Sequence, residues 1–198
     1  MKIKLLFLLL IASPLVAFGQ KYKITAGDYS ALSGATEFNV EVDYSQVTYY
    51  NEKMSEAKYI ERRMKDKDGD DVNAIKKDWD KMKEERIPDK ITTIANKYCK
   101  NGQNYAVDNG AAKITMIVRP QWIYPGWFGG VMKSPSKLNV NYDFVDAANP
   151  SKVLLSISCT KAVGDIYPVG IPNTNMRIAE AFAHSTKGLV RLLNKKIK

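Results

Sequence analysis

The sequence predicts an exported α+β protein in which an antiparallel or mixed sheet of about four strands packs against helices, in the order β-α-α-α-β-β-β-α. Three observations support this prediction. A short apolar segment opens the chain, apolar residues recur every three or four positions through the middle, and they alternate with polar residues through most of the remainder. The 198 residues contain no internal repeat and no long linker, so we expect a single domain over residues 20–198.

Residues 1–19 have the three parts of a secretory signal peptide. Two lysines precede an apolar run over 5–12, and a pattern of small residues precedes the predicted cleavage site between Gly19 and Gln20. A retained anchor is the alternative, but a membrane-spanning helix needs about 20 apolar residues and this run is shorter. We therefore expect a periplasmic or secreted protein with no transmembrane segment after signal removal.

The first strand is predicted over 37–44, where Phe38 and Val40 alternate with acidic and amide residues. This pattern is typical of a half-buried antiparallel strand. Three helices should follow. They run from a Ser55 cap to about residue 65, from 72 to 86, and from Pro88, which suits a first helical turn, to about residue 99.

The period returns to two near residue 113, which predicts strands over 113–118, 138–144 and 153–159. A turn over 146–151 should join the last two strands into a hairpin. The final helix is expected to begin at an Asn173 or Thr174 cap and to end in a basic tail.

The charge of the chain is unevenly distributed. Without the signal peptide it has 28 basic and 21 acidic residues, a net charge of +7, and residues 101–198 alone carry +7. In an exported protein this field favours an anionic lipid, an acidic polysaccharide or an acidic envelope protein as partner, before nucleic acid. A surface charged for solubility alone is the simpler alternative.

An aromatic stretch between Pro120 and Pro135 is the main candidate for binding. Aromatic side chains beside cations can stack on sugars, enter a membrane interface or anchor a protein partner. Alternatively, the stretch is a loop that folds back and caps the core. The candidate binding residues are Trp122, Tyr124, Trp127 and Phe128, with Arg119 and Lys133 beside them.

Cys99 and Cys159, the two cysteines, fall on predicted inward faces. An oxidising compartment would allow them to form a disulfide, and two buried free thiols are the alternative.

No metal, cofactor or catalytic constellation is predicted. Residues 66–71 resemble the start of a calcium-binding loop, but Asp71 stands where that loop needs glycine and Lys77 where it needs glutamate. His184, one helical turn after Glu180, could act as a base, although no nucleophile motif accompanies it. An exposed helical histidine is the alternative.

Several short segments carry a resemblance to known proteins. Residues 124–127 (Tyr-Pro-Gly-Trp), 149–154 and 177–182 make the chain similar to a group of secreted proteins of unassigned function from Bacteroides-like Gram-negative bacteria. It more distantly resembles periplasmic α+β domains of envelope assembly. The resemblance implies an exported, helix-backed sheet and assigns no catalytic residue.

We therefore expect a non-enzymatic, exported binding module that contacts a cell-envelope component or a protein partner. The alternative is a small hydrolase that acts on envelope material with His184 as its base.

Overall fold

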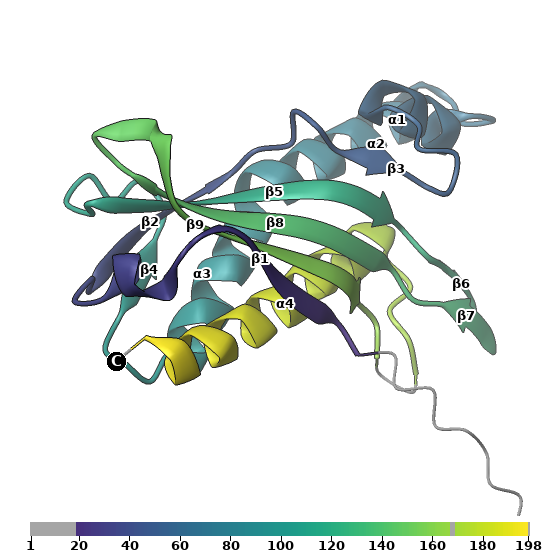
Figure 1. Ribbon diagram of the computed structural model, residues 1–198. Helices are drawn as coiled ribbons and strands as arrows, with labels where there is room; N and C mark the ends of the chain where they lie inside the picture. The colour runs from purple at the N-terminus through teal and green to yellow at the C-terminus, as the bar shows by residue number, and fades with distance from the viewer. Residues whose placement is uncertain (1–18, 167–168, 198) are drawn as a thin grey trace, which may run out of the picture.

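The computed structural model describes residues 19–166 and 169–197 (Figure 1). Residues 1–18 of the predicted signal peptide lie outside the described residues. The described chain forms a seven-stranded sheet in the order β1-β9-β8-β5-β2-β4, with β3 also pairing with β5. Its strands are β1 (Lys21–Gly27), β2 (Glu37–Val42), β3 (Thr48–Tyr49), β4 (Asn104–Ala106), β5 (Ile114–Tyr124), β8 (Lys137–Asp146) and β9 (Asn149–Val163).

The predicted hairpin is confirmed, because β8 and β9 are antiparallel neighbours with Tyr142 opposite Ile157. β5 pairs antiparallel with the other edge of β8. All three strands are longer than their apolar alternation suggested, and the turn is shorter, since Asn149 already pairs with Asp146. The centre of the sheet is therefore one extended antiparallel unit.

The prediction of about four strands is wrong, because the sheet has seven, and of the two predicted arrangements, antiparallel or mixed, the mixed one is confirmed. β2 buries Phe38 and Val40 as its alternation indicated, but it runs parallel to both β4 and β5. Alternation reports which face of a strand is buried and carries no information about the direction of its neighbours. The sheet is mixed, and the short strands β3 and β4 and the exposed edge strand β1 were not predicted.

The four predicted helices are present as α1 (Glu56–Met64), α2 (Gly69–Lys81), α3 (Ile87–Tyr98) and α4 (Thr174–Lys196). Ser55 caps α1 by accepting a hydrogen bond from Lys58 N, and Asn173 caps α4 by accepting one from Met176 N. A turn of π-helix over Met82–Arg86 joins α2 directly to α3. None of the described helices has the length and apolar character needed to cross a membrane.

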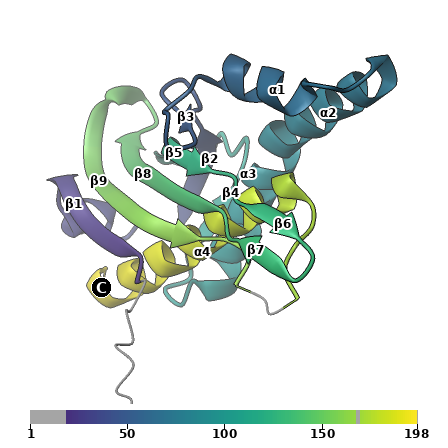
Figure 2. The ribbon, with the colours of Figure 1, turned by 90° about the vertical axis from the view of Figure 1, so that its right-hand side faces the viewer.

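Helices α3 and α4 lie against one face of the curved sheet (Figure 2). The side chains expected in the core are there: Val40 is 3% exposed, and Val140 and Leu155 are fully buried. α1 and α2 extend past the end of the sheet. Tyr59 of α1 stacks on Tyr49 of β3, with ring centroids 4.5 Å apart, and Trp79 of α2 meets the same ring edge-on at 5.7 Å. Within the described chain, no α-helix covers the opposite face of the sheet.

The stretch expected as an aromatic loop is mostly strand. β5 continues to Tyr124, and a separate hairpin follows, made of β6 (Trp127–Gly129) and β7 (Met132–Ser134). Gly126, with a φ of 69°, makes the turn between β5 and β6, where an added Cβ would lie 2.3 Å from the Ser134 carbonyl oxygen. The candidate binding residues therefore lie partly on β5 and partly on the β6–β7 hairpin.

Candidate functional site

The uncovered face of the sheet is polar. Ile117, Asp143 and Ser156 form one cross-strand row on it, and Arg119, Asn141 and Ser158 form the next. These residues alternate along their strands with the core residues that face α3 and α4, so the same periodicity that builds the core also builds this polar face. Apart from Ile117, the side chains of these two rows carry hydroxyl, amide, carboxylate or guanidinium groups, and Ile117 and Ser156 are only 7% and 8% exposed.

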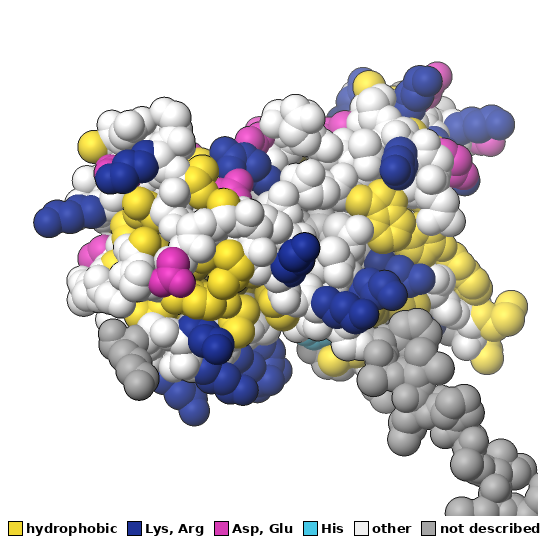
Figure 3. All heavy atoms as spheres, in the orientation of Figure 1, with side chains coloured by type: hydrophobic (Ala, Val, Ile, Leu, Met, Phe, Trp, Pro, Cys, Tyr) yellow, Lys and Arg dark blue, Asp and Glu magenta, His cyan; other side chains and the backbone are white. Residues whose placement is uncertain are grey.

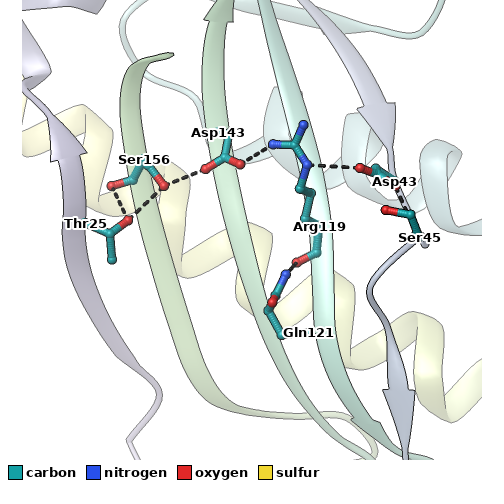
Figure 4. Close-up of polar contacts among 7 residues, drawn as sticks. All are labelled: Thr25, Asp43, Ser45, Arg119, Gln121, Asp143 and Ser156. Atoms are coloured by element: carbon teal, nitrogen blue, oxygen red, sulfur yellow. Dashed lines mark hydrogen bonds and ion pairs between the residues drawn. The ribbon is translucent and has the colours of Figure 1, made fainter. Parts of the chain in front are cut away.

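A chain of polar contacts crosses this face from β1 to β2 (Figure 4). Thr25 donates a hydrogen bond to Ser156 (2.8 Å), and Ser156 donates to Asp143. Arg119 then bridges Asp143 to Asp43, with 3.0 Å between Arg119 Nε and Asp43 Oδ2. Figure 4 also shows the Asp43 carboxylate beside Ser45 and the Gln121 amide beside the Arg119 backbone.

The charge of Arg119 is balanced within this chain of contacts. Burial lowers the pKa of Arg119, but hydrogen bonds to Asp43 and Asp143 outweigh that effect and raise it. The backbone N–H of Ser45, with the Arg119 contact, lowers the pKa of Asp43. Arg119 was predicted as a binding cation, and the structure places it as the bridge between two acids.

A β-bulge brings Trp122 onto the polar face. In the pairing of β5 with β8, Pro120 faces Val140 and Trp122 faces the next residue, Asn139, so Gln121 is the extra residue of β5. The bulge reverses the alternation: Ile123 points into the core, 1% exposed, and Trp122 points away from it. The Trp122 indole N–H donates to the Tyr50 carbonyl oxygen (2.6 Å), which fixes the ring.

Trp122 lies in a shallow groove of about 600 Å³ at the edge of the polar face. Tyr124 continues the aromatic surface, with its ring stacked beside Trp122 at a centroid distance of 6.4 Å. We call this site the Trp122 groove. It is lined by Thr48, Asn51, Lys53, Gln121, Trp122 and Asn139.

Several polar groups in the Trp122 groove have capacity left for a ligand. Asn139 uses its carbonyl oxygen to accept from Lys161 N (3.0 Å), which leaves its NH₂ group as a donor. Gln121 uses its NH₂ group on the Arg119 carbonyl, which leaves its own side-chain oxygen as an acceptor. Asn51 and Lys53 are exposed on the turn after β3.

The remaining predicted site residues belong to a different surface. Trp127 and Phe128 are on β6, and Phe128 packs against Gly170. Lys133, on β7, forms an ion pair with the fully buried carboxylate of Asp165 at 3.3 Å. The aromatic stretch is thus divided between the Trp122 groove and the β6–β7 hairpin.

A group of cations around Tyr98 was not predicted as a site. Lys97, Lys187 and Arg191 place their charges 5.9, 4.7 and 5.2 Å from the centre of the Tyr98 ring. A hydrogen bond from Lys187, together with the nearby positive charges, lowers the pKa of the Tyr98 hydroxyl. These four residues form the Tyr98 cluster; Figure 3 shows Lys and Arg side chains gathered at this lower edge of the molecule. They were missed because α3 and α4 are far apart in the sequence.

Among the described residues, the surroundings of His184 bring no nucleophile or carboxylate to its imidazole. His184 Nδ1 contacts the Val163 carbonyl oxygen, and Glu180 forms an ion pair with Lys90 at 2.6 Å. The shallow pocket beside His184 is lined by Gly19, Gln20, Lys161, Val163, Ile166 and His184, with no hydroxyl or carboxylate side chain among them. No group of three potential metal ligands occurs among the described residues.

The two cysteines are free thiols in the structure. Cys99, at the end of α3, contacts the Gln103 side chain at 3.8 Å, whereas Cys159 is fully buried in β9. Burial raises the pKa of the Cys159 thiol to about 11. The structure thus has the two free thiols that were the alternative to a disulfide. A disulfide between Cys99 and Cys159 stays a prediction.

Neither the family models nor the curated proteins contain a match to this chain. Two solved structures of PelC dodecamers from Paraburkholderia phytofirmans are weakly similar. One superposes with a TM-score of 0.38 at 12% identity, covering 91% of this chain and 99% of that chain. The other, a PelC variant, gives 0.37 at 10% identity, covering 91% and 100%. A TM-score below 0.5 does not establish a common fold, so neither superposition supports a functional assignment.

Proposed function

We propose that this protein, exported and freed of residues 1–19, is a non-enzymatic module that binds an acidic polysaccharide of the cell envelope. The observation that carries the proposal is the Trp122 groove, where a fixed aromatic ring lies among amide, hydroxyl and ammonium groups. Ligand sites commonly combine an apolar surface with a few polar groups that set orientation.

The chemistry of the groove suits a sugar. A pyranose ring presents C–H groups on its faces and hydroxyl groups around its rim, so it can cover an indole while its hydroxyls reach polar neighbours. Asn139 offers a donor and Gln121 an acceptor beside the ring. Because adjacent strands lie about 4.8 Å apart, a groove that spans β3, β5 and β8 is about 10 Å wide and admits a short stretch of glycan.

Cations at the groove favour an acidic glycan over a neutral one. Lys53 is part of the lining, and Lys137 holds its ammonium 5.7 Å from the centre of the Tyr124 ring. The acids of the polar face, Asp43 and Asp143, are paired with Arg119, and Glu52, between Asn51 and Lys53, is paired with Arg62 at 3.9 Å. A carboxylated sugar bound against Trp122 would therefore meet positive charge.

Binding to polygalacturonate, measured by isothermal titration calorimetry, tests the proposal. We expect Trp122→Ala to weaken binding about tenfold, equivalent to ~1.4 kcal/mol, and Lys53→Gln to weaken it by a smaller factor. Neutral dextran of the same length should bind at least about tenfold more weakly than polygalacturonate.

Trp127→Ala is the matched control, because Trp127 is 45% exposed but lies outside the groove. It should bind polygalacturonate as the unchanged protein does. Since Trp122 also holds the Tyr50 carbonyl, Asn51→Ala provides a second test at an exposed lining residue, and it should also weaken binding of polygalacturonate. Equal affinities of the Trp122 and Trp127 variants, or no binding by the unchanged protein, would overturn the proposal.

A further inference from the structure

One end of the molecule exposes an unusual amount of apolar surface. Of the nine large hydrophobic side chains exposed among the described residues, six lie on the β6–β7 hairpin or on the 165–176 segment beside it. We call these six residues the apolar tip. They are Trp127 (45% exposed), Val131 (102%), Met132 (70%), Ile166 (65%), Val169 (84%) and Met176 (54%). Figure 3 shows hydrophobic side chains continuing to the end of this hairpin.

Polar contacts beneath the apolar tip connect it to the rest of the domain. Arg177 is 1% exposed and donates hydrogen bonds to the carbonyl oxygens of Ile171 and Pro172, both at 2.7 Å, and of Pro125 at 3.4 Å. Lys133 pairs with the buried Asp165. These contacts join the β6–β7 hairpin and Pro125 before it to Asp165, to residues 171–172 and to the start of α4. The backbone that carries the tip is thus tied to the rest of the domain before any binding.

Lysines outnumber acids in the segments that form and flank the tip. Residues 120–142 contain no Asp or Glu, and residues 147–179 contain only Asp165, whose carboxylate is buried against Lys133. Lys137 and Lys161 are exposed nearby, and Lys161 lines the same shallow pocket as Ile166. Asp78 of α2, which accepts a hydrogen bond from Asn175 beside Met176, is paired with Arg86 at 2.6 Å. An apolar projection flanked by lysines complements a bilayer, which has an apolar interior and, with acidic lipids, an anionic surface.

We propose that the apolar tip docks the protein on the surface of an anionic lipid bilayer. Val131 and Met132 enter the boundary between headgroups and acyl chains, and Trp127 lies at headgroup depth, where amphipathic rings prefer to sit. Lys137 and Lys161 face the anionic headgroups. A protein partner would need an apolar pocket shaped for the tip, whereas a fluid bilayer accepts its irregular outline.

Co-sedimentation with vesicles tests this proposal on the exported protein, purified after the host has processed it. We expect it to pellet with vesicles of phosphatidylethanolamine and phosphatidylglycerol and much less with phosphatidylcholine alone. The double substitution Val131→Asp, Met132→Asp should lower the partition coefficient at least about tenfold, because it places two charges where two apolar side chains would be buried.

Val107→Asp is the matched control, since Val107 is 45% exposed on the turn after β4, away from the tip. It should partition like the unchanged protein. Equal partitioning of the tip variant, equal binding to neutral vesicles, or no binding to any vesicle would overturn the proposal. Light scattering tests whether the tip instead binds a second copy of this chain. If the protein were a dimer and the Val131→Asp, Met132→Asp variant a monomer, the tip would be a dimer interface and the membrane proposal would be wrong. Trp122→Ala should leave vesicle binding unchanged, which separates this test from that of the groove.

Discussion

At the scale of single residues, the extra residue Gln121 in β5 determines that Trp122 lies on the uncovered face of the sheet. Strict alternation from Val118 through Pro120 would direct Trp122 into the core and Ile123 to solvent. The extra residue reverses both, and the buried position goes to the aliphatic side chain. Proline in a strand interior is itself typical of a bulge, because it cannot donate a ladder hydrogen bond.

The two thiols should differ sharply in reactivity. Because thiolate is the reactive form and burial raises the pKa of Cys159 to about 11, Cys159 should stay unmodified by iodoacetamide at pH 8 in the folded protein. Cys99 is partly exposed and should react first. Peptide mass spectrometry after timed alkylation measures both sites. Since the folded-state pKa lies above pH 8, reaction at Cys159 should rise as the pH approaches 11.

Unfolding the protein without reductant supplies the control for this experiment. Recovery of two alkylated thiols would agree with the unbonded cysteines of the structure. Recovery of neither thiol would show that the cysteines are joined in a disulfide, as predicted for an oxidising compartment. Rapid native alkylation of Cys159 would contradict its burial.

The sequence identified part of the site at this scale. Trp122 and Tyr124 could be selected because aromatic residues between prolines and glycines are conspicuous. Thr48 and Lys53 could not, since they reach the groove through the pairing of β3 with β5 across about seventy residues of chain. The balanced charge of Arg119 was equally hidden, because Asp43 and Asp143 meet it only after folding.

At the scale of elements, Arg177 joins pieces that have few apolar contacts of their own. β6 and β7 have three residues each, too few for a stable isolated hairpin. The Arg177 guanidinium satisfies carbonyl oxygens on two segments and the Thr174 hydroxyl (2.9 Å). Burial lowers the pKa of Arg177, and these acceptors offset part of that cost.

Arg177→Met should therefore lower the free energy of unfolding by roughly 3 kcal/mol, because buried carbonyl groups lose their donor. For a domain of this size, that corresponds to a fall in Tm of roughly 6–12 °C. Differential scanning calorimetry measures it. Arg177→Lys should restore only part of the loss, since an ammonium group cannot reproduce the planar fork.

Arg191→Met, on the exposed side of the same helix, is the matched control and should change Tm little. If the Arg177→Met and Arg191→Met variants had the same Tm, Arg177 would not hold the hairpin in place.

The elements themselves were predictable where their signals are local. Ser55 and Asn173 bond to backbone groups three residues away, so both caps could be read from sequence. β1 could not be identified, because its edge position leaves most of its residues exposed and removes the apolar alternation. The π-helical turn was also hidden. Because of this turn, the helical backbone continues from α2 into α3 past Pro88, although a proline normally disrupts the helix that precedes it.

At the scale of the whole molecule, the positive charge is divided between two regions. One surrounds the Trp122 groove and the apolar tip; the other is the Tyr98 cluster, in a part of the chain where residues 181–198 contain no acid. Under the proposed function both regions would attract a polyanion, and the groove would supply the Trp122 ring and the Asn139 and Gln121 amides that contact the sugar. The Tyr98 cluster should thus act at long range, through the overall field.

Ionic strength separates these two contributions. The double substitution Lys187→Gln, Arg191→Gln should slow association with immobilised polygalacturonate several-fold at about 0.01 M salt, where charges act over about 30 Å. At 0.15 M salt, where that range is about 8 Å, its Kd should match that of the unchanged protein. Lys53→Gln should raise Kd at both salt concentrations, because Lys53 lines the groove and would contact the bound sugar. Biolayer interferometry measures both rates. If the double variant lost binding at 0.15 M salt while Lys53→Gln did not, the polysaccharide would bind across α3 and α4 at the Tyr98 cluster, and the groove would have no part in it.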